Sequence, residues 1–275
     1  MAGATYTHGH HPSVLRSHAW RTVANSAAYV VDRFVPGADV LDVGCGPGSI
    51  TAEIATLVAP GLVVGVDSTD APLDSARETA EGIDNVEFRV GDVFGLDFPA
   101  ASFDVVHAHQ LLQHVPDPVA ALREMDRVCR AGGVVAARDS DYAGMHWFPQ
   151  VPELDEWLDL YRTLARGNGG EPDAGRRLLS WARTAGLTDV AATASVWCFA
   201  APEERLWWGR MWADRVRESA FARQAIDRGL ATWGDLDRLA RGWQRWADHD
   251  DGWFAVPHGE IVAAGRARAG AASGP

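Results

Sequence analysis

The feature that most constrains this chain is a regular alternation of short apolar runs with helix-length segments across residues 38–139. Continuous apolar runs of this length are typical of strands buried on both faces of a parallel sheet. The segments between them are long enough to cross the sheet as helices. We therefore predict an α/β fold with a mostly parallel sheet. The predicted strands are 40–43, 62–67, 86–90, 103–108 and 133–138, and the predicted helices are 49–58, 70–81 and 118–130.

After residue 139 helical segments dominate, and 11 of the 12 tryptophans follow residue 145. We expect most of these rings to pack helices together, with one or two lining an apolar pocket. Further helices are expected over 17–34, 152–166 and 173–185, and strands over 190–199 and 253–264. The predicted divisions are 1–36 (an arm and helix closing over the site), 37–200 (core), 201–250 (helical insertion forming a substrate cap), 251–265 (final core strand) and 266–275 (disordered tail).

Charge and composition narrow the classes of partner. The net charge of −12 disfavours a nucleic-acid substrate, because a polyanion would be repelled by such a surface. No apolar run approaches the roughly 20 residues of a membrane span, and the N-terminus does not resemble a signal peptide. The three cysteines form no CxxC pair, which indicates a reducing compartment and no metal site. We expect a cytoplasmic protein whose partners are small molecules. The sequence is also compatible with a homodimer.

The strongest local signal is a predicted strand that runs into a glycine-rich turn and then a helix. Glycines occupy positions 44, 46 and 48, where missing side chains allow a ligand to approach the backbone. In open parallel sheets, ligands bind outside the carboxyl ends of the strands. The spacing is G-x-G-x-G rather than the G-x-G-x-x-G of dinucleotide-binding proteins.

Acidic residues end the next two predicted strands. Asp67 is the last residue of the second strand, where its carboxylate can accept hydrogen bonds from both hydroxyls of a ribose. Asp92 follows the third strand, where it can accept from an adenine amino group while the next backbone N–H donates to a ring nitrogen. The alternative is that each Asp caps a turn or helix, a common role for this residue.

Taken together, the motifs resemble those of class I S-adenosylmethionine-dependent methyltransferases, especially the ubiquinone/menaquinone C-methyltransferase-like group. The resemblance is strong over about a third of the chain, between residues 40 and 133. It rests on Leu41-Asp42-Val43-Gly44-Cys45-Gly46-Pro47-Gly48, Gly65-Val66-Asp67, Gly91-Asp92-Val93, Phe103-Asp104-Val105-Val106-His107, Leu112-Gln113-His114-Val115-Pro116-Asp117-Pro118 and Arg130-Ala131-Gly132-Gly133. The family usually has Pro at the position of Ala131. The helical stretch 202–248 is larger than a minimal member needs. A quinone substrate is therefore less expected for this chain than for that group.

The resemblance implies a Rossmann-like, seven-stranded, mostly parallel sheet whose last strand is antiparallel. It also implies S-adenosylmethionine as cofactor, with the glycines along the methionyl group and Asp42 helping to hold the ammonium. Asp67 would hold the ribose, Asp92 and Val93 the adenine, and the His109 carbonyl the ammonium. The predicted cofactor contacts are Asp42, Gly44, Cys45, Gly46, Gly48, Asp67, Ser68, Gly91, Asp92, Val93, His109 and His114.

Methyl transfer needs a base only if the nucleophile carries a proton at neutral pH, and histidine is then the usual choice. The candidate catalytic residues are His146, His114 and Asp141. The candidate substrate contacts are Tyr6, His10, His11, Tyr142, His146 and Trp147. Each group has a structural alternative: a solvated arm around Tyr6 to His11, a helix start at His114, and an ordinary loop after Asp139.

We therefore predict an enzyme that transfers a methyl group from S-adenosylmethionine to carbon, oxygen or nitrogen of a small acceptor, such as a secondary metabolite or a quinone-like compound. One alternative is a protein that binds the cofactor without methylating, for regulation or a pericyclic reaction. Another is an NAD-dependent oxidoreductase, which the glycine spacing disfavours.

Overall fold

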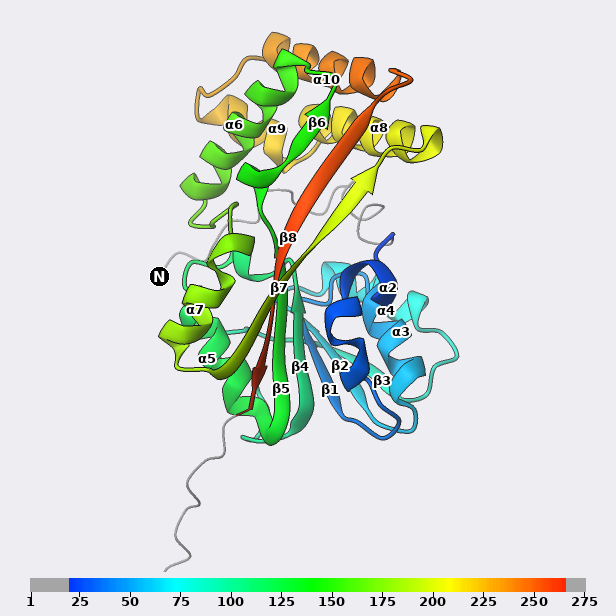
Figure 1. The fold of residues 1–275 in the computed structure, drawn as a ribbon, viewed down its shortest axis with the longest axis vertical. Helices are drawn as coiled ribbons and strands as arrows, with labels where there is room; N and C mark the ends of the chain where they lie inside the picture. Colours follow the sequence, from blue (N-terminus) through cyan, green and yellow to red (C-terminus); the bar gives the residue numbers. More distant parts are fainter. Residues whose placement is uncertain (1–19, 266–275) are drawn as a thin grey trace, which may run out of the picture.

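A computed structural model describes residues 20–265, and its centre is one mixed sheet. The strand order is β3-β2-β1-β4-β5-β8-β6, with β7 paired to the other side of β8 (Figure 1). Strands β1 to β5 pair in parallel, and β8 runs antiparallel to β5, β6 and β7. The strands are β1 (Val40–Val43), β2 (Val63–Asp67), β3 (Val86–Val90), β4 (Phe103–His109), β5 (Cys129–Ser140), β6 (His146–Phe148), β7 (Thr188–Phe199) and β8 (Trp253–Ala264). The predicted fold with its antiparallel last strand is confirmed, and the three-residue strand β6 is an addition that the sequence analysis did not predict.

Helices cover both faces of the sheet because successive strand residues point to opposite sides. Val40, Val105 and Ala136 pack beneath one group of helices, whereas Leu41 and Val106 pack beneath another. The first group is α2 (Val23–Ser26), the 3-10 helix η1 (Ala28–Arg33) and α3 (Ser49–Val58), and the second is α5 (Pro118–Val128) and α7 (Leu178–Ala185). The remaining core elements are α4 (Ala71–Thr79), which packs beside α3 and β3, and the 3-10 helices η2 (Leu112–His114), η3 (Tyr142–Gly144) and η4 (Gly175–Arg177).

The prediction of one continuous helix over residues 17–34 is wrong where the structure describes it. A short helix α2 begins after Thr22, whose side chain accepts a hydrogen bond from the Asn25 N–H in a capping box. The backbone of Ala27 then leaves the helical region, with φ at −133°. The chain continues as the 3-10 helix η1, so the apolar residues keep their buried positions although the α-helix stops.

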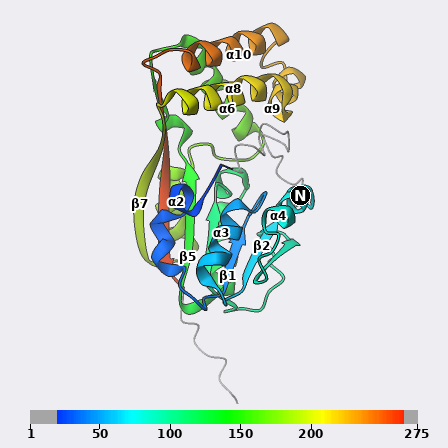
Figure 2. The same ribbon diagram turned by 90° about the vertical axis from the view of Figure 1, so that its right-hand side faces the viewer.

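A layer of helices stands over one end of the sheet, at the top of Figures 1 and 2. It consists of α6 (Pro152–Gly167), α8 (Pro202–Glu218), α9 (Ala220–Asp227) and α10 (Trp233–Ala247). Strands β7 and β8 are long enough to leave the core and reach this layer, where β6 pairs with the start of β8. We call these four helices, β6 and the adjoining ends of β7 and β8 the cap. Helix α6 packs against α9 and α10 although it lies outside the predicted insertion.

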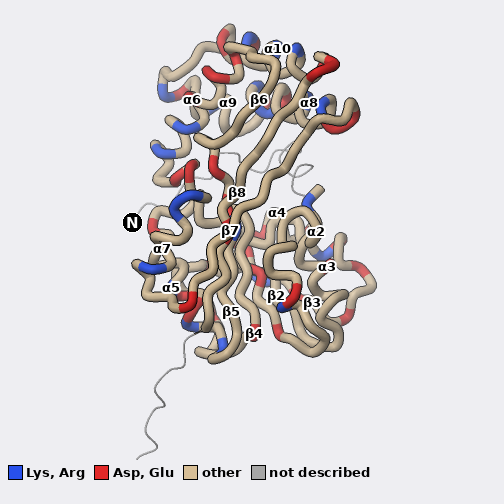
Figure 3. The backbone as a smooth tube through the Cα atoms, in the orientation of Figure 1, with Lys and Arg blue, Asp and Glu red and all other residues tan. Residues whose placement is uncertain are grey.

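Aromatic rings fill the interior of the cap. Trp157, Trp212, Trp243 and Trp246 are fully buried together with Phe254 from β8. Acidic and basic residues are interspersed along the chain of the cap, as Figure 3 shows, and some of them form ion pairs such as Arg238 with Glu156. Among residues 20–265, no helix is both long and apolar enough to cross a membrane.

Candidate active site

A large cavity lies between the carboxyl ends of the parallel strands and the cap. Its volume is about 1250 Å³, which exceeds the roughly 300–1,000 Å³ of a typical site for one small molecule. One half, the acidic half, is lined by the ends of β1, β2 and β3 and the loops after them: Asp42, Gly44, Cys45, Gly46, Asp67, Ser68, Gly91, Asp92 and Val93. The other half, the aromatic half, is lined by Tyr142, Met145, Trp197, Trp208, Trp212 and Val256. The cavity therefore has room for two molecules of different character.

Two carboxylates of the acidic half stand at neighbouring strand ends because β2 and β3 are adjacent and parallel. Asp67 ends β2, and its Oδ2 accepts a hydrogen bond from the Gly46 N–H at 3.1 Å. Asp92 follows β3, and its Oδ1 accepts from the Phe94 N–H at 3.0 Å. An ionised carboxylate can accept about four hydrogen bonds, so carboxylates at the cavity wall suit a ligand that donates several.

The carboxylate of Asp42 is deeper and is already bound by two side chains. Its Oδ2 accepts from the Thr51 hydroxyl at 2.6 Å, and its Oδ1 lies 2.8 Å from Nδ1 of His107 on β4. These contacts join β1 to α3 and β4 behind the glycine turn. Asp42 thus holds the turn in place as well as lining the cavity.

The glycines of the turn serve different purposes. Gly44 has φ at +76°, and a Cβ there would lie 3.0 Å from the Leu111 side chain. Gly48 also has φ at +76°, but it does not line the cavity; a Cβ there would lie 2.8 Å from Cβ of Ala76 on α4. Gly48 is therefore required for the start of α3 and its contact with α4, a structural reason that the sequence interpretation did not contain.

Two histidines lie between the two halves: His109 at the end of β4 and His114 in η2. Burial, with a contribution from Arg21, lowers the pKa of His114 to about 3, and Gln113 Nε2 donates to its Nε2 at 3.0 Å. Burial also lowers the pKa of His109 well below its usual range, as do the nearby Arg21 and Arg138 guanidinium groups. Both rings line the cavity. Because its pKa is low, His114 is a weak base, which disfavours the role of proton acceptor predicted for it.

Several predicted residues do not reach the cavity. His146 is exposed on β6, while Trp147 points inward and stacks on Phe254 with ring centroids 5.6 Å apart. Asp141 accepts a 2.6 Å hydrogen bond from Nε of Arg176 and likewise does not line the cavity. Tyr142 does line it. Tyr6, His10 and His11 lie outside the described residues. We therefore leave His146, Trp147 and Asp141 out of the proposed site.

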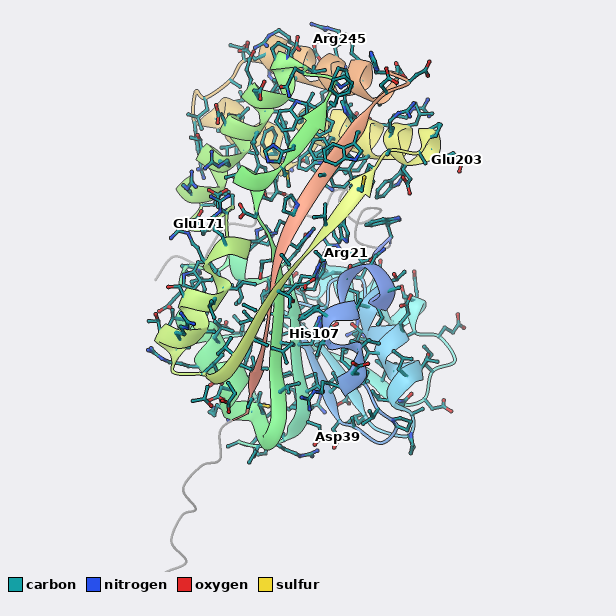
Figure 4. The ribbon with its side chains drawn as sticks, viewed as in Figure 1. Arg21, Asp39, His107, Glu171, Glu203 and Arg245 are labelled. Atoms are coloured by element: carbon teal, nitrogen blue, oxygen red, sulfur yellow. The ribbon has the colours of Figure 1, made fainter. Side chains whose placement is uncertain are left out.

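The structure adds residues that the sequence analysis missed. Arg21, before α2, donates from Nη2 to Oε1 of Gln110 at 2.7 Å, and Gln110 Nε2 lies 2.8 Å from Nε2 of His258 on β8. Figure 4 shows Arg21 at the level where the cap meets the core. Gln110 has φ at +52°, an uncommon value for a residue other than glycine, and such strain is frequent at functional sites. No sequence motif links these positions, since only the tertiary fold brings the segment before α2, the end of β4 and β8 together.

A buried carboxyl group beneath the cavity yields a pH prediction. Burial raises the pKa of Asp139 to about 7, although its Oδ1 accepts from the Gln113 N–H at 3.0 Å. Between about pH 4 and 7 the unfolded chain has this group ionised, while the folded chain holds a proton. The Asp139 contribution to stability is therefore full below pH 4 and is lost as the pH rises towards 7, by at most about 1.4 kcal/mol per pH unit.

We expect Asp139→Asn to remove this part of the pH dependence, because an amide does not titrate. The measurement is the free energy of unfolding in urea from pH 4 to 7 for both proteins. The difference between variant and natural protein should change steadily across this range. A constant difference would contradict the raised pKa of Asp139.

The fold and site can be compared with known proteins. A family model described as a methyltransferase domain matches residues 35–186. An uncharacterized methyltransferase of Schizosaccharomyces pombe is 37% identical over 271 residues, covering 94% of this chain and 95% of that protein. The demethylmenaquinone methyltransferase of Staphylococcus aureus is 35% identical over 119 residues, 43% of this chain and 49% of that protein. Phosphoethanolamine N-methyltransferase 2 of Haemonchus contortus, solved with phosphomonomethylethanolamine and S-adenosylhomocysteine, shares the fold with a TM-score of 0.55 and 19% identity, over 87% of this chain and 52% of that one.

The fold, the glycine turn and these similarities define a class I S-adenosylmethionine-dependent methyltransferase. The chain belongs to the methyltransferase domain family, over a region that includes β1 to β5 and the acidic half of the cavity. The residues that line the acidic half fit this cofactor. Carboxylates at strand ends accept hydrogen bonds from ribose hydroxyls and an amino group, and their negative charge favours a positively charged sulfur nearby. The similarity to the quinone methyltransferase covers less than half of either chain.

Proposed function

We propose that this enzyme methylates a small, flat and largely apolar acceptor that binds in the aromatic half of the cavity, beneath the cap. The observation that carries this proposal is the composition of one continuous cavity, acidic at the ends of β1 to β3 and aromatic below the cap. Flat rings stack favourably on Trp and Tyr side chains, which offer large apolar faces. Quinone-like compounds and aromatic secondary metabolites both belong to this class of acceptor.

In this proposal the acidic half holds the cofactor, which supplies an electrophilic methyl group on a positively charged sulfur. Asp67 accepts from the ribose hydroxyls, and Asp92 with the Val93 N–H binds the adenine. The backbone at Gly44 and Gly46 lies along the methionyl group. Cys45 remains a neutral thiol there, because burial and the carboxylates of Asp42 and Asp67 raise its pKa well above the usual range.

The strand order supports this orientation. In the sheet, β3, β2, β1 and β4 are successive neighbours, so sites for adenine, ribose and methionyl group follow one another towards β4. The residues after β4 then separate the methionyl site from the aromatic half. An acceptor stacked against Trp197 and Trp212 is thereby confined next to the reacting end of the cofactor, and such confinement supplies much of the rate of a displacement reaction.

The test is a panel of acceptors offered with cofactor that carries an isotopic label in its methyl group. The panel contains hydroxylated and amino-substituted naphthalenes and naphthoquinols, with aliphatic alcohols and amines of similar size. We expect labelled products from bicyclic aromatic compounds, and at least a tenfold lower rate in Trp212→Ala, which removes one wall of the aromatic half. The matched control is Trp233→Ala, whose ring is exposed on α10.

Two results would oppose the proposal. Tight cofactor binding without any labelled product across the panel would favour a protein that binds the cofactor without methylating. Equal rates for aliphatic and aromatic acceptors would show that the aromatic half does not select the substrate.

A further inference from the structure

The side chain of His109 lies at the boundary between the two halves of the cavity. His109 is the last residue of β4, the strand that follows β1 in the sheet order, and it pairs with Arg138 on β5. Its ring centroid lies 5.7 Å from that of Trp197 and 6.2 Å from that of His258. The imidazole therefore stands where an acceptor in the aromatic half would meet the methionyl site.

The hydrogen-bonding capacity of this ring is unused among residues 20–265. His109 is only 4% exposed and lines the cavity, yet neither Nδ1 nor Nε2 has a hydrogen-bond partner there. His258 bonds through Nδ1 to the Val256 carbonyl and through Nε2 to Gln110. His107 bonds to Asp42 through Nδ1 and leaves Nε2 without a partner among the described residues, but it does not line the cavity. A buried polar group without a partner costs roughly 1–3 kcal/mol, which a ligand that bonds to it would recover.

The groups around His109 keep its ring neutral. Burial is the main cause of its lowered pKa, and Arg21 from the segment before α2, Arg138 from β5, His258 from β8 and His107 from β4 act in the same direction. A neutral imidazole carries one N–H donor and one acceptor nitrogen. This pair matches a hydroxyl group, which also both donates and accepts.

We propose that the His109 imidazole hydrogen-bonds a hydroxyl group of the acceptor, so that the natural substrate is a hydroxylated aromatic compound oriented by this contact. The inference rests on the proposed function, because it names a polar contact between the enzyme and the acceptor in the aromatic half. His109 thereby selects acceptors with a hydroxyl next to the reacting position. It also holds the hydroxyl without a change of charge on the enzyme.

The experiment compares two probes of nearly equal size, 2-naphthol and 2-methylnaphthalene, bound to the enzyme saturated with S-adenosylhomocysteine. Quenching of tryptophan fluorescence gives the affinities, and calorimetry gives the S-adenosylhomocysteine affinity in the same samples. We expect 2-naphthol to bind about tenfold more tightly or better, although a purely apolar pocket would prefer the methyl compound. Because His109 stays neutral, this preference should not follow the titration of an ordinary imidazole at about pH 6.5.

Three variants make the result specific. His109→Phe keeps a flat ring and should abolish the preference, whereas His109→Asn should restore part of it through its amide. His249→Phe, at an exposed position beyond α10, should leave the preference intact. Equal affinities of the two probes, no binding of either, or a preference that survives His109→Phe would overturn the inference. If S-adenosylhomocysteine itself fails to bind, the proposed function fails with it; retained cofactor affinity confines the failure to His109.

Discussion

Replacing Trp157 with alanine should lower the free energy of unfolding by about 3–5 kcal/mol, the cost of deleting a large aromatic side chain from a packed core. Trp157 on α6 is fully buried, and its ring lies edge-on to Trp212 at 4.5 Å and to Trp243 at 4.7 Å between centroids. Its removal leaves a hole at the point where α6, α8 and α10 meet. The neighbouring rings are large and rigid, so the cavity cannot close easily.

Denaturation in urea measures this effect, with Trp233→Ala as the matched control. Trp233 is 57% exposed at the start of α10, and its loss should change stability by less than about 0.5 kcal/mol. A loss below about 1 kcal/mol in Trp157→Ala would show that the tryptophans do not form one packed unit.

The second large effect is expected at the cofactor. Asp67→Ala should weaken binding of S-adenosylhomocysteine by about 1.5–3 kcal/mol, which is roughly 10- to 150-fold, because hydrogen bonds to a charged group are lost. Asp67→Asn should weaken binding less, since the amide retains one acceptor oxygen. Titration calorimetry on the folded proteins measures both.

Asp70→Ala is the control for Asp67, because Asp70 is exposed three residues further on, pairs with Arg77 and does not line the cavity. Thermal unfolding without ligand tests for damage to the glycine turn, to which Asp67 also bonds. Unchanged affinity in Asp67→Ala would remove this residue from the ribose site.

The acidic half of the cavity was predictable because its determinants are local in sequence. Each acid lies within two residues of the carboxyl end of its own strand, and the carboxyl ends of parallel strands share one edge of a sheet. Strand type and direction therefore suffice to bring Asp42, Asp67 and Asp92 together. The glycine spacing resembles that of a known family, and this resemblance indicates which class of ligand binds there.

The loop after β5 could not be predicted in the same way. Residues 140–148 stand at the correct edge of the sheet, yet only some of them reach the cavity. Because β6 is a strand, His146 and Phe148 point outward while Trp147 between them is buried. A shift of one residue in pairing would exchange these roles, and the sequence alone does not determine that pairing.

The sequence by itself determined the α/β core and the carboxylates of the acidic half, since these depend on short-range periodicity and on turns of fixed spacing. The antiparallel last strand followed from the resemblance to a known family rather than from any local pattern. Only the tertiary structure decided the aromatic half of the cavity. His109, Trp197 and His258 are separated by about 150 positions from first to last, and they meet because β8 pairs with both β5 and β7. Long-range strand register, rather than any local pattern, thus placed an unpartnered imidazole beside the aromatic wall.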